Sequence, residues 1–181
     1  MLRRLKKDVL TELPDKIEQT LYVEMSDEQR KLYEQRRNFY QTAIGSQIAK
    51  KGVQGAQFFI FQALNELRQI ASIPEHVSDG KVISPKRELL QEQLLDTIAN
   101  GHKALVFANY LIAVELIGEA LNEAGINYVS MTGATKDRQQ LVDKFQNEDD
   151  CKVFIMTLKT GGTGLNLTAA DTIFILILGG M

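Results

Sequence analysis

A glycine-rich segment that follows an apolar stretch carries the strongest chemical signal in the sequence. It reads TLKTGGTGLNLTAADT over residues 157–172 and packs three glycines into four positions, Gly161, Gly162 and Gly164. Glycines allow backbone N–H groups to approach a phosphate closely, because no Cβ atom stands in the way. The segment therefore predicts a phosphate-binding loop, with a tight connection that binds no ligand as the alternative.

Other phosphate and metal motifs are absent from the sequence. The dinucleotide-binding pattern G-x-G-x-x-G does not fit this segment. It would need a small residue at the position of Leu167 and a helix that begins directly after the glycines, and neither is present. No G-x-x-x-x-G-K-[ST] loop occurs, and the acidic pair Asp27–Glu28 is better explained as the first turn of a capped helix. Cys151 and the two distant histidines lack metal-ligand spacing. We expect neither a catalytic residue nor a metal site in this chain.

The composition is that of an ordinary folded protein. Its 181 residues suffice for one α/β domain with a helical attachment. A net charge of −2 excludes a uniformly basic surface but permits a local basic patch. The longest apolar run near either end, residues 173–178, is too short to span a bilayer. We expect no membrane partner and a cytoplasmic location, associated with the nucleoid if the source is bacterial.

The order of predicted elements changes near residue 84. Before it, Ser26 and Gln29 predict a capping box that opens a helix to about Lys50, and residues 55–72 predict a second helix with a wide apolar face. This face includes Phe58, Phe59, Ile60, Phe61, Leu64 and Leu67. Residues 50–55 are predicted as a turn and residues 73–85 as a loop.

After residue 84 helices and strands alternate. Helices are predicted over 84–100, 110–124 and 136–146, and strands over 103–108, 126–131, 152–157 and 171–178. The strands are short, continuous and apolar, as in a parallel sheet covered on both faces, and they supply the predicted core: Leu105, Val106, Phe107, Val153, Phe154, Ile155, Ile173, Phe174 and Ile175. Ligands gather at the carboxyl ends of such strands. We therefore expect an α/β lobe over 84–181, preceded by a helical extension over 1–83.

Five segments resemble the SWI/SNF-type ATPases, a branch of the superfamily-two helicases. VFIMTLKTGGTGLNLTAADTIFI (153–175) resembles their motif V, and KALVFANY (103–110) their motif IV strand. YVSMTGATKDRQQLVDKFQ (128–146) resembles the segment between these motifs. LRRLKKDVLTELPDKIEQTLYVEMSDEQRKLYE (2–34) is similar to the stretch that joins the two lobes of the family. ALNELRQIASIP (63–74) is similar to the family's Leu-Arg-x-Ile-x-x-x-Pro helix end. The segments occur in the family's order and span nearly the whole chain.

Three positions depart from the family pattern. Ala71 and Ile73 stand where the family usually has Cys and His, and Thr160 stands for Ala in the motif V loop. None of these changes affects the three glycines of the motif V segment, so the resemblance holds.

The resemblance implies a RecA-like (P-loop NTPase-type) fold and the second lobe of an ATP-dependent DNA translocase. By this resemblance the residues near the DNA backbone are Thr157, Lys159, Gly161, Gly162, Asn109, Thr132 and Gly133. Gly164 and Asn166 would face the nucleotide. ATP and Mg²⁺ would be held mainly by the first lobe, which with double-stranded DNA is the implied partner.

Each of these roles has a simpler alternative. Lys159 is also compatible with an ordinary solvent-exposed lysine. Asn109, Thr132 and Gly133 are residue types that loops commonly use without binding a ligand. Asn166 also suits a turn fixed by its own side chain.

Family members continue into a tryptophan-containing segment and a helix whose arginines complete the ATP site. This chain has no tryptophan, and its last arginine is Arg138. Arginine fingers raise hydrolysis rates by about 10³ to 10⁵. We therefore expect a truncated lobe, engineered or natural, that does not hydrolyse ATP alone.

Two other hypotheses remain open from the sequence. The long helical first half, rich in Gln and Arg, also suits a non-catalytic protein-interaction module. A small-molecule enzyme that holds a phosphorylated ligand lacks an evident acid, base or nucleophile, since Cys151 has no nearby histidine.

Overall fold

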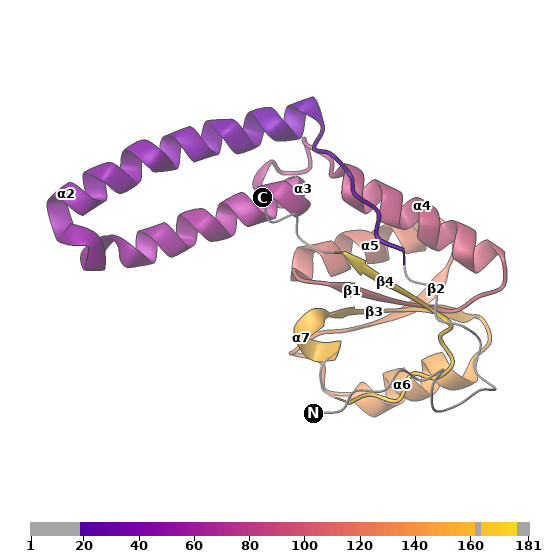
Figure 1. The fold of residues 1–181 in the computed structure, drawn as a ribbon. Coiled ribbons are helices and arrows are strands. Elements are labelled where there is room, and N and C mark those ends of the chain that lie inside the picture. The colour runs from indigo at the N-terminus through magenta and orange to yellow at the C-terminus, as the bar shows by residue number, and fades with distance from the viewer. Residues whose placement is uncertain (1–18, 162–163, 177–181) are drawn as a thin grey trace, which may run out of the picture.

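The fold consists of a long helical hairpin beside an α/β lobe (Figure 1). The computed structural model describes residues 19–161 and 164–176. The hairpin is α2 (Asp27–Ser72), and the short helix α3 (Pro74–Val77) follows at its base. The lobe contains α4 (Pro85–Ala99), β1 (Ala104–Ala108), α5 (Leu111–Glu123), β2 (Asn127–Met131), α6 (Arg138–Asn147), β3 (Cys151–Thr157), α7 (Leu158–Gly161) and β4 (Thr172–Leu176).

The hairpin arises because Gly52 interrupts α2. Gly52 has φ 74° and ψ 173°, a conformation that residues with a Cβ rarely adopt, so the chain reverses there. Two antiparallel arms result, as the sequence predicted from its turn at residues 50–55. Ser26 caps the first arm by accepting a hydrogen bond from Gln29 N at 3.1 Å. The side chain of Gln29 does not complete a capping box, because its Nε2 donates instead to Ile70 O in the other arm at 2.8 Å.

A partly buried aromatic cluster joins the two arms of the hairpin. Arg36 donates to both carboxylate oxygens of Glu66, at 2.9 and 3.2 Å, and the hydroxyl of Tyr40 donates to the same carboxylate. The guanidinium also lies over the rings of Phe39 and Tyr40. Bidentate, charge-assisted contacts of this kind fix geometry, so the arms are held at a defined spacing.

The lobe is built on a four-stranded parallel sheet in the order β2-β3-β1-β4. Helices α4 and α5 cover one face over a core that includes Leu94, Val106, Ile117 and Ile155. Helix α6 covers the other face through Phe145, which packs edge to face on Phe154. The predicted α/β fold with helices on both faces is confirmed, and each predicted lobe helix and strand is present within a few residues.

The structure corrects the sequence-based prediction at four places. Ile173 and Ile175, predicted as core, are 59% and 51% exposed, because β4 is an edge strand of the described sheet and α6 covers β2 and β3 instead. Half of the apolar face predicted over 55–72 is exposed, namely Phe58, Phe61 and Leu64, whereas the buried positions 56 and 63 are alanines. The predicted loop over 73–85 contains α3, and one helical turn, α7, follows β3.

Candidate nucleic-acid interface

The predicted site residues gather at one edge of the sheet. Parallel strands end at a common edge, and there Ala108 of β1 pairs with Thr157 of β3, while Met131 of β2 pairs with Met156. Asn109 and Thr132 follow directly on β1 and β2. The loops after three neighbouring strands therefore bring Asn109, Thr132, Gly133, Thr157, Lys159 and Gly161 to the same edge. Gly162 lies outside the described residues.

Thr157 acts locally as the cap of α7. Its Oγ1 accepts from Thr160 N at 3.3 Å and lies 2.8 Å from Thr160 Oγ1. Thr160, where the family usually has alanine, is buried. The hydroxyl of Thr157 is thus already shared within the turn, whereas Lys159 is exposed beside it. Of these two residues, Lys159 is the one whose side chain reaches solvent at the edge.

Gly161 is required by packing. A Cβ atom added there would overlap the ring of Phe107, with Cδ1 at 2.8 Å. Phe107 belongs to β1, so the glycine lets the turn after β3 lie flat against the neighbouring strand. Gly133 has nothing within 4 Å of such a Cβ atom. Packing against Phe107 therefore requires a glycine at position 161, whereas packing sets no such requirement at position 133.

The loop after β2 is held by its own threonines. Thr132 N donates to Thr135 Oγ1 at 2.9 Å, and Thr135 N donates to Thr132 O at 3.2 Å. Arg138, at the start of α6, donates to Thr135 O at 3.3 Å and so stabilises this loop. Gly133 is exposed on the same turn, which leaves its backbone accessible.

The second half of the glycine-rich segment runs away from this edge. Gly164 has φ 72°, a left-handed conformation that favours glycine. Leu165 and Leu167 then pack against the core on the α6 side, and Ala169 N donates to Gln146 Oε1 at 2.7 Å. This path returns the chain to the opposite edge, where β4 must begin in order to run parallel to β1. Gly164 is exposed where this path begins, and Asn166 is exposed midway along it.

Tyr110 links this edge of the lobe to the hairpin. Its hydroxyl donates to Asn65 Oδ1 in the second arm at 3.4 Å. Burial raises the pKa of Tyr110, and the nearby Arg68 cation opposes that rise. An open pocket lies between α5 and the hairpin base, lined in part by Gln69, His76 and Tyr110. The second arm therefore lies next to the carboxyl edge, and Arg68 is a cation there that the sequence pattern did not single out as a site residue.

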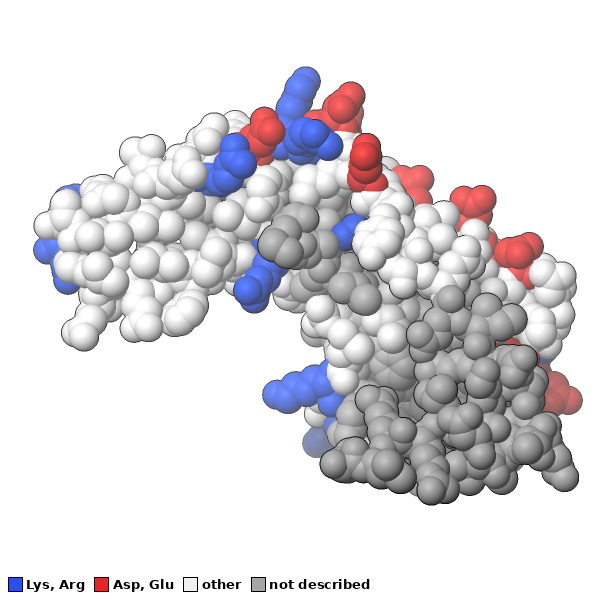
Figure 2. All heavy atoms as spheres, viewed as in Figure 1, with Lys and Arg blue, Asp and Glu red and all other residues white. Residues whose placement is uncertain are grey.

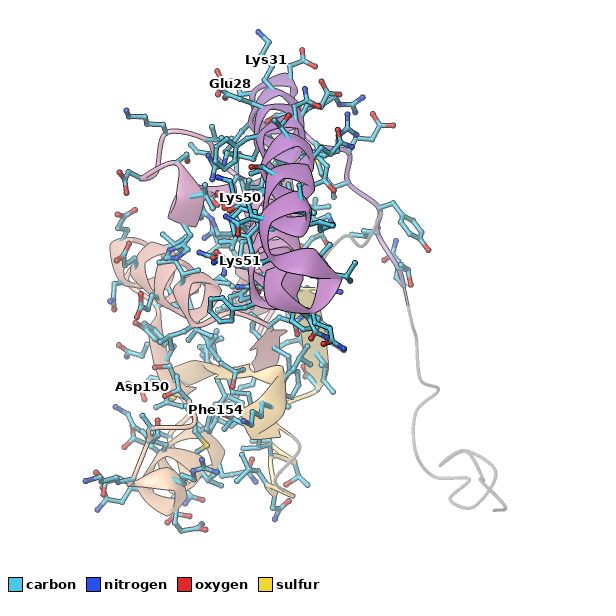
Figure 3. All side chains as sticks on the ribbon, turned by 90° about the vertical axis from the view of Figure 1, so that its left-hand side faces the viewer. Glu28, Lys31, Lys50, Lys51, Asp150 and Phe154 are labelled. Carbon is cyan, nitrogen blue, oxygen red and sulfur yellow. The ribbon has the colours of Figure 1, made fainter. Side chains whose placement is uncertain are left out.

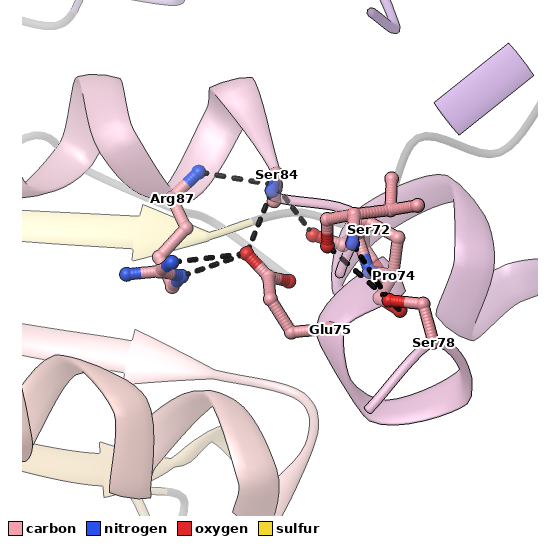
Figure 4. A network of polar contacts seen from close by, with 7 residues as sticks. Ser72, Pro74, Glu75, Ser78, Ser84 and Arg87 are labelled. Atoms are coloured by element: carbon pink, nitrogen blue, oxygen red, sulfur yellow. Dashed lines mark hydrogen bonds and ion pairs between the residues drawn. The ribbon is translucent and has the colours of Figure 1, made fainter. Parts of the chain in front are cut away.

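A buried network fixes the hairpin base to α4 (Figure 4). Glu75 Oε1 accepts from Ser84 N at 2.6 Å and from Arg87 Nε and Nη2 at 3.1 and 3.0 Å. Ser84 Oγ donates to Ser72 O at 2.8 Å and caps α4 by accepting from Arg87 N at 3.2 Å. These contacts join the end of α2, α3 and the start of α4. We call Ser72, Glu75, Ser84 and Arg87 the basal latch.

Charges are distributed unevenly over the surface. In the view of Figure 2, Lys and Arg side chains border the hollow between the hairpin and the lobe, and Asp and Glu side chains lie along the outer side over α4. The underside of the hairpin, which forms the roof of this hollow, is mostly uncharged. Figure 3 looks toward the hairpin tip, which carries Lys50 and Lys51. The hollow thus has basic borders and a mostly uncharged roof.

Family models match both parts of the chain. The helicase conserved C-terminal domain matches residues 85–178, more than half of the sequence, and the SNF2-related domain matches residues 1–76. The chain belongs to the SNF2-type helicases. Its lobe is the C-terminal, RecA-like lobe of that superfamily-two family.

Several known SNF2-type proteins are similar over nearly all of the chain. An uncharacterized ATP-dependent helicase of Mycoplasma pneumoniae is 32% identical over 175 residues, which cover 96% of this chain and 16% of that protein. The transcription regulatory protein SNF2 of Saccharomyces cerevisiae is 36% identical over 194 residues, 97% of this chain and 11% of that protein. The chain therefore spans only a small part of the length of these relatives.

Solved SNF2-type structures share the fold. The C-terminal domain of the Sulfolobus solfataricus SWI2/SNF2 ATPase superposes with a TM-score of 0.76 at 24% identity, covering 91% of this chain and 73% of that domain. The ATPase core of the Sulfolobus protein in complex with double-stranded DNA gives 0.76 at 23% identity, covering 94% and 37%. At this identity the likeness establishes the RecA-like fold.

The described residues hold neither a membrane span nor a metal centre. Over 19–161 and 164–176, no helix is both long and apolar enough to cross a bilayer. Within the same ranges no group of three or more His, Cys, Asp or Glu side chains is placed to hold a metal ion.

Proposed function

We propose that this chain is the second lobe of an ATP-dependent DNA translocase and grips the DNA backbone at the carboxyl edge of its sheet. The observation that carries the proposal is the convergence of three loops there, after β1, β2 and β3. They present the exposed side chains of Asn109 and Lys159 and the exposed glycine Gly133. A cation, an amide and accessible backbone suit phosphate oxygens and carry no base sequence, as a sequence-indifferent motor requires.

The family's dependence on ATP supports a second role, in which the lobe forms one wall of the nucleotide cleft with the first lobe. Gly164 and Asn166 are the proposed contacts in this chain, and both are exposed. The metal ion that assists phosphoryl transfer would need ligands from elsewhere, because the described residues do not gather acidic side chains into a suitable set. The chain alone is therefore proposed not to hydrolyse ATP.

The test is duplex binding at low salt by the wild-type chain, Lys159→Ala and a matched control. Lys152→Ala is that control, because Lys152 lies near the opposite end of the same strand, β3. Loss of one phosphate contact should weaken binding and reduce the slope of log K against log salt by roughly 1. An unchanged slope in Lys159→Ala, or an equal loss in Lys152→Ala, would remove the carboxyl edge as the gripping surface.

A further inference from the structure

The second arm of the hairpin carries an exposed apolar stripe that no contact within the described chain covers. Phe58, Phe61 and Leu64 are 82%, 61% and 46% exposed, and they follow one another at three-residue spacing on the helix. Isolated exposed apolar residues are common, but a contiguous row that includes two phenylalanines marks an interaction surface. We call these three residues the hairpin stripe.

The position of the hairpin stripe is fixed by its neighbours. Asn65, adjacent to Leu64, accepts a hydrogen bond from Tyr110 at the carboxyl edge of the sheet. The stripe therefore runs along the arm from the lobe toward the tip, and the hairpin's mostly uncharged side borders the hollow in Figure 2. The aromatic cluster around Arg36 and Glu66 holds the two arms together behind it. A rigid surface loses little conformational freedom when a partner binds.

The chemistry of the arm indicates what the stripe binds. From Val53 to Asn65 the sequence has no charged residue. A phosphate backbone is bound through rows of Lys and Arg, so this surface does not suit DNA. Exposed cations lie at both ends instead, Lys50 and Lys51 at the tip and Arg68 at the base. From Val53 to Arg68 the arm is about 22 Å long, the length of a short helix.

We propose that the hairpin stripe docks an amphipathic helix of a partner protein, with apolar residues along one face and acidic residues at both ends. The apolar face covers Phe58, Phe61 and Leu64, and the terminal carboxylates meet Lys50, Lys51 and Arg68. This is the helix-on-apolar-surface mode of recognition, read by anchors at i, i+3, i+4 and i+7. It is independent of the DNA contacts proposed for the carboxyl edge.

The test uses a synthetic, fluorescently labelled peptide of about 18 residues, with leucines at helical spacing on one face and two glutamates at each end. One control peptide has the same composition in scrambled order, and the other has lysines in place of the terminal glutamates. Binding to the chain is measured by fluorescence anisotropy. The variant is the double substitution Phe58→Ser with Phe61→Ser. The control variant is Leu95→Ser, which changes a leucine that is 40% exposed on α4.

The acidic-ended peptide should bind wild type and Leu95→Ser alike. It should lose about tenfold or more in affinity for the double variant, as expected when central aromatic anchors are removed. The scrambled and lysine-ended peptides should bind weakly to all three proteins. Circular dichroism of the double variant should match wild type, since both phenylalanines are exposed and packing is unchanged.

Any one of the following outcomes would overturn the proposal. They are equal peptide binding by the double variant, equal binding of the lysine-ended peptide, no peptide binding at all, and a dimer of the wild-type chain in light scattering that the double variant loses. A loss of duplex DNA binding in the double variant would also overturn it and assign the stripe to DNA. Failure of Lys159→Ala to affect DNA would instead refute only the proposed function.

Discussion

Replacing Arg87 by methionine should separate the contribution of the basal latch from that of the rest of the fold. The side chain of Glu75 is only 5% exposed and that of Arg87 is 13% exposed. Arg87→Met keeps the apolar stem but removes both donors to Glu75 Oε1, leaving only Ser84 N. Glu75 Oε2 already has no hydrogen-bond partner among the described atoms. The variant therefore leaves a buried carboxylate with one donor.

The expected cost follows from that geometry. Removing one partner of a buried ion pair costs about 3 to 5 kcal/mol. Because the backbone donor of Ser84 remains, we expect a loss of about 3 kcal/mol, near the lower end of that range. Glu75→Met combined with Arg87→Met should recover much of the loss, because no unpaired charge then stays buried. The loss should persist at high salt, since buried pairs are weakly screened.

The assay is urea unfolding followed by far-UV circular dichroism and by tyrosine fluorescence, since the chain has no tryptophan. Coincident curves from the two probes justify a single free energy of unfolding. A double-mutant cycle over Glu75 and Arg87 then gives their coupling energy. Additive single-variant effects, or a loss below about 1 kcal/mol in Arg87→Met, would refute the claim that this pair fixes the hairpin to the lobe.

Three further predictions concern single residues. Gly161→Ala should cost about 1 to 3 kcal/mol because the new methyl group meets the ring beneath it, whereas Gly133→Ala should stay within about 0.5 kcal/mol in the same unfolding assay. Gly52→Ala should lower the free energy of unfolding by about 1 to 3 kcal/mol, because the backbone at residue 52 has a positive φ. Gly45→Ala, in open space within the first arm, should instead raise it by about 0.5 to 1 kcal/mol. Equal effects of the two substitutions would contradict the claim that Gly52 is needed for the kink. Burial raises the pKa of Cys151 above its ordinary value of 9.0. As the pH rises, the unfolded chain therefore loses the thiol proton before the folded chain does, and the free energy of unfolding should fall above about pH 9. Urea titrations of Cys151→Ala should lack this decline.

Much of the fold follows from local patterns. Ser84 and Pro85 mark the start of α4, and the short runs rich in Val, Ile and Phe mark strands, because capping and branched side chains act locally. Strand order is different, since it depends on pairing between distant segments. The sequence therefore did not reveal that β4 is an edge strand of the described sheet, with Ile173 and Ile175 uncovered. Hydrophobicity alone does not distinguish a core residue from one on an open sheet face.

The site residues show the same limit. The glycine-rich pattern located the turn after β3 and the edge to which it belongs. It did not separate Gly161, which is required by the ring of Phe107, from Gly133, which has open space around it. Nor did it show that the hydroxyl of Thr157 caps α7. Each of these properties depends on what lies opposite in space.

The order of the hairpin and the sheet along the chain also has a consequence for biosynthesis. The contacts that close the hairpin, such as Gln29 to Ile70 and Arg36 to Glu66, are complete once residue 70 has been made. The central strand β1 gains its second neighbour only when Thr172 arrives to pair with Ala104. Local helical contacts form faster than distant parallel pairings. We expect the hairpin to fold first on the ribosome, presenting its phenylalanines to chaperones while the sheet is still incomplete.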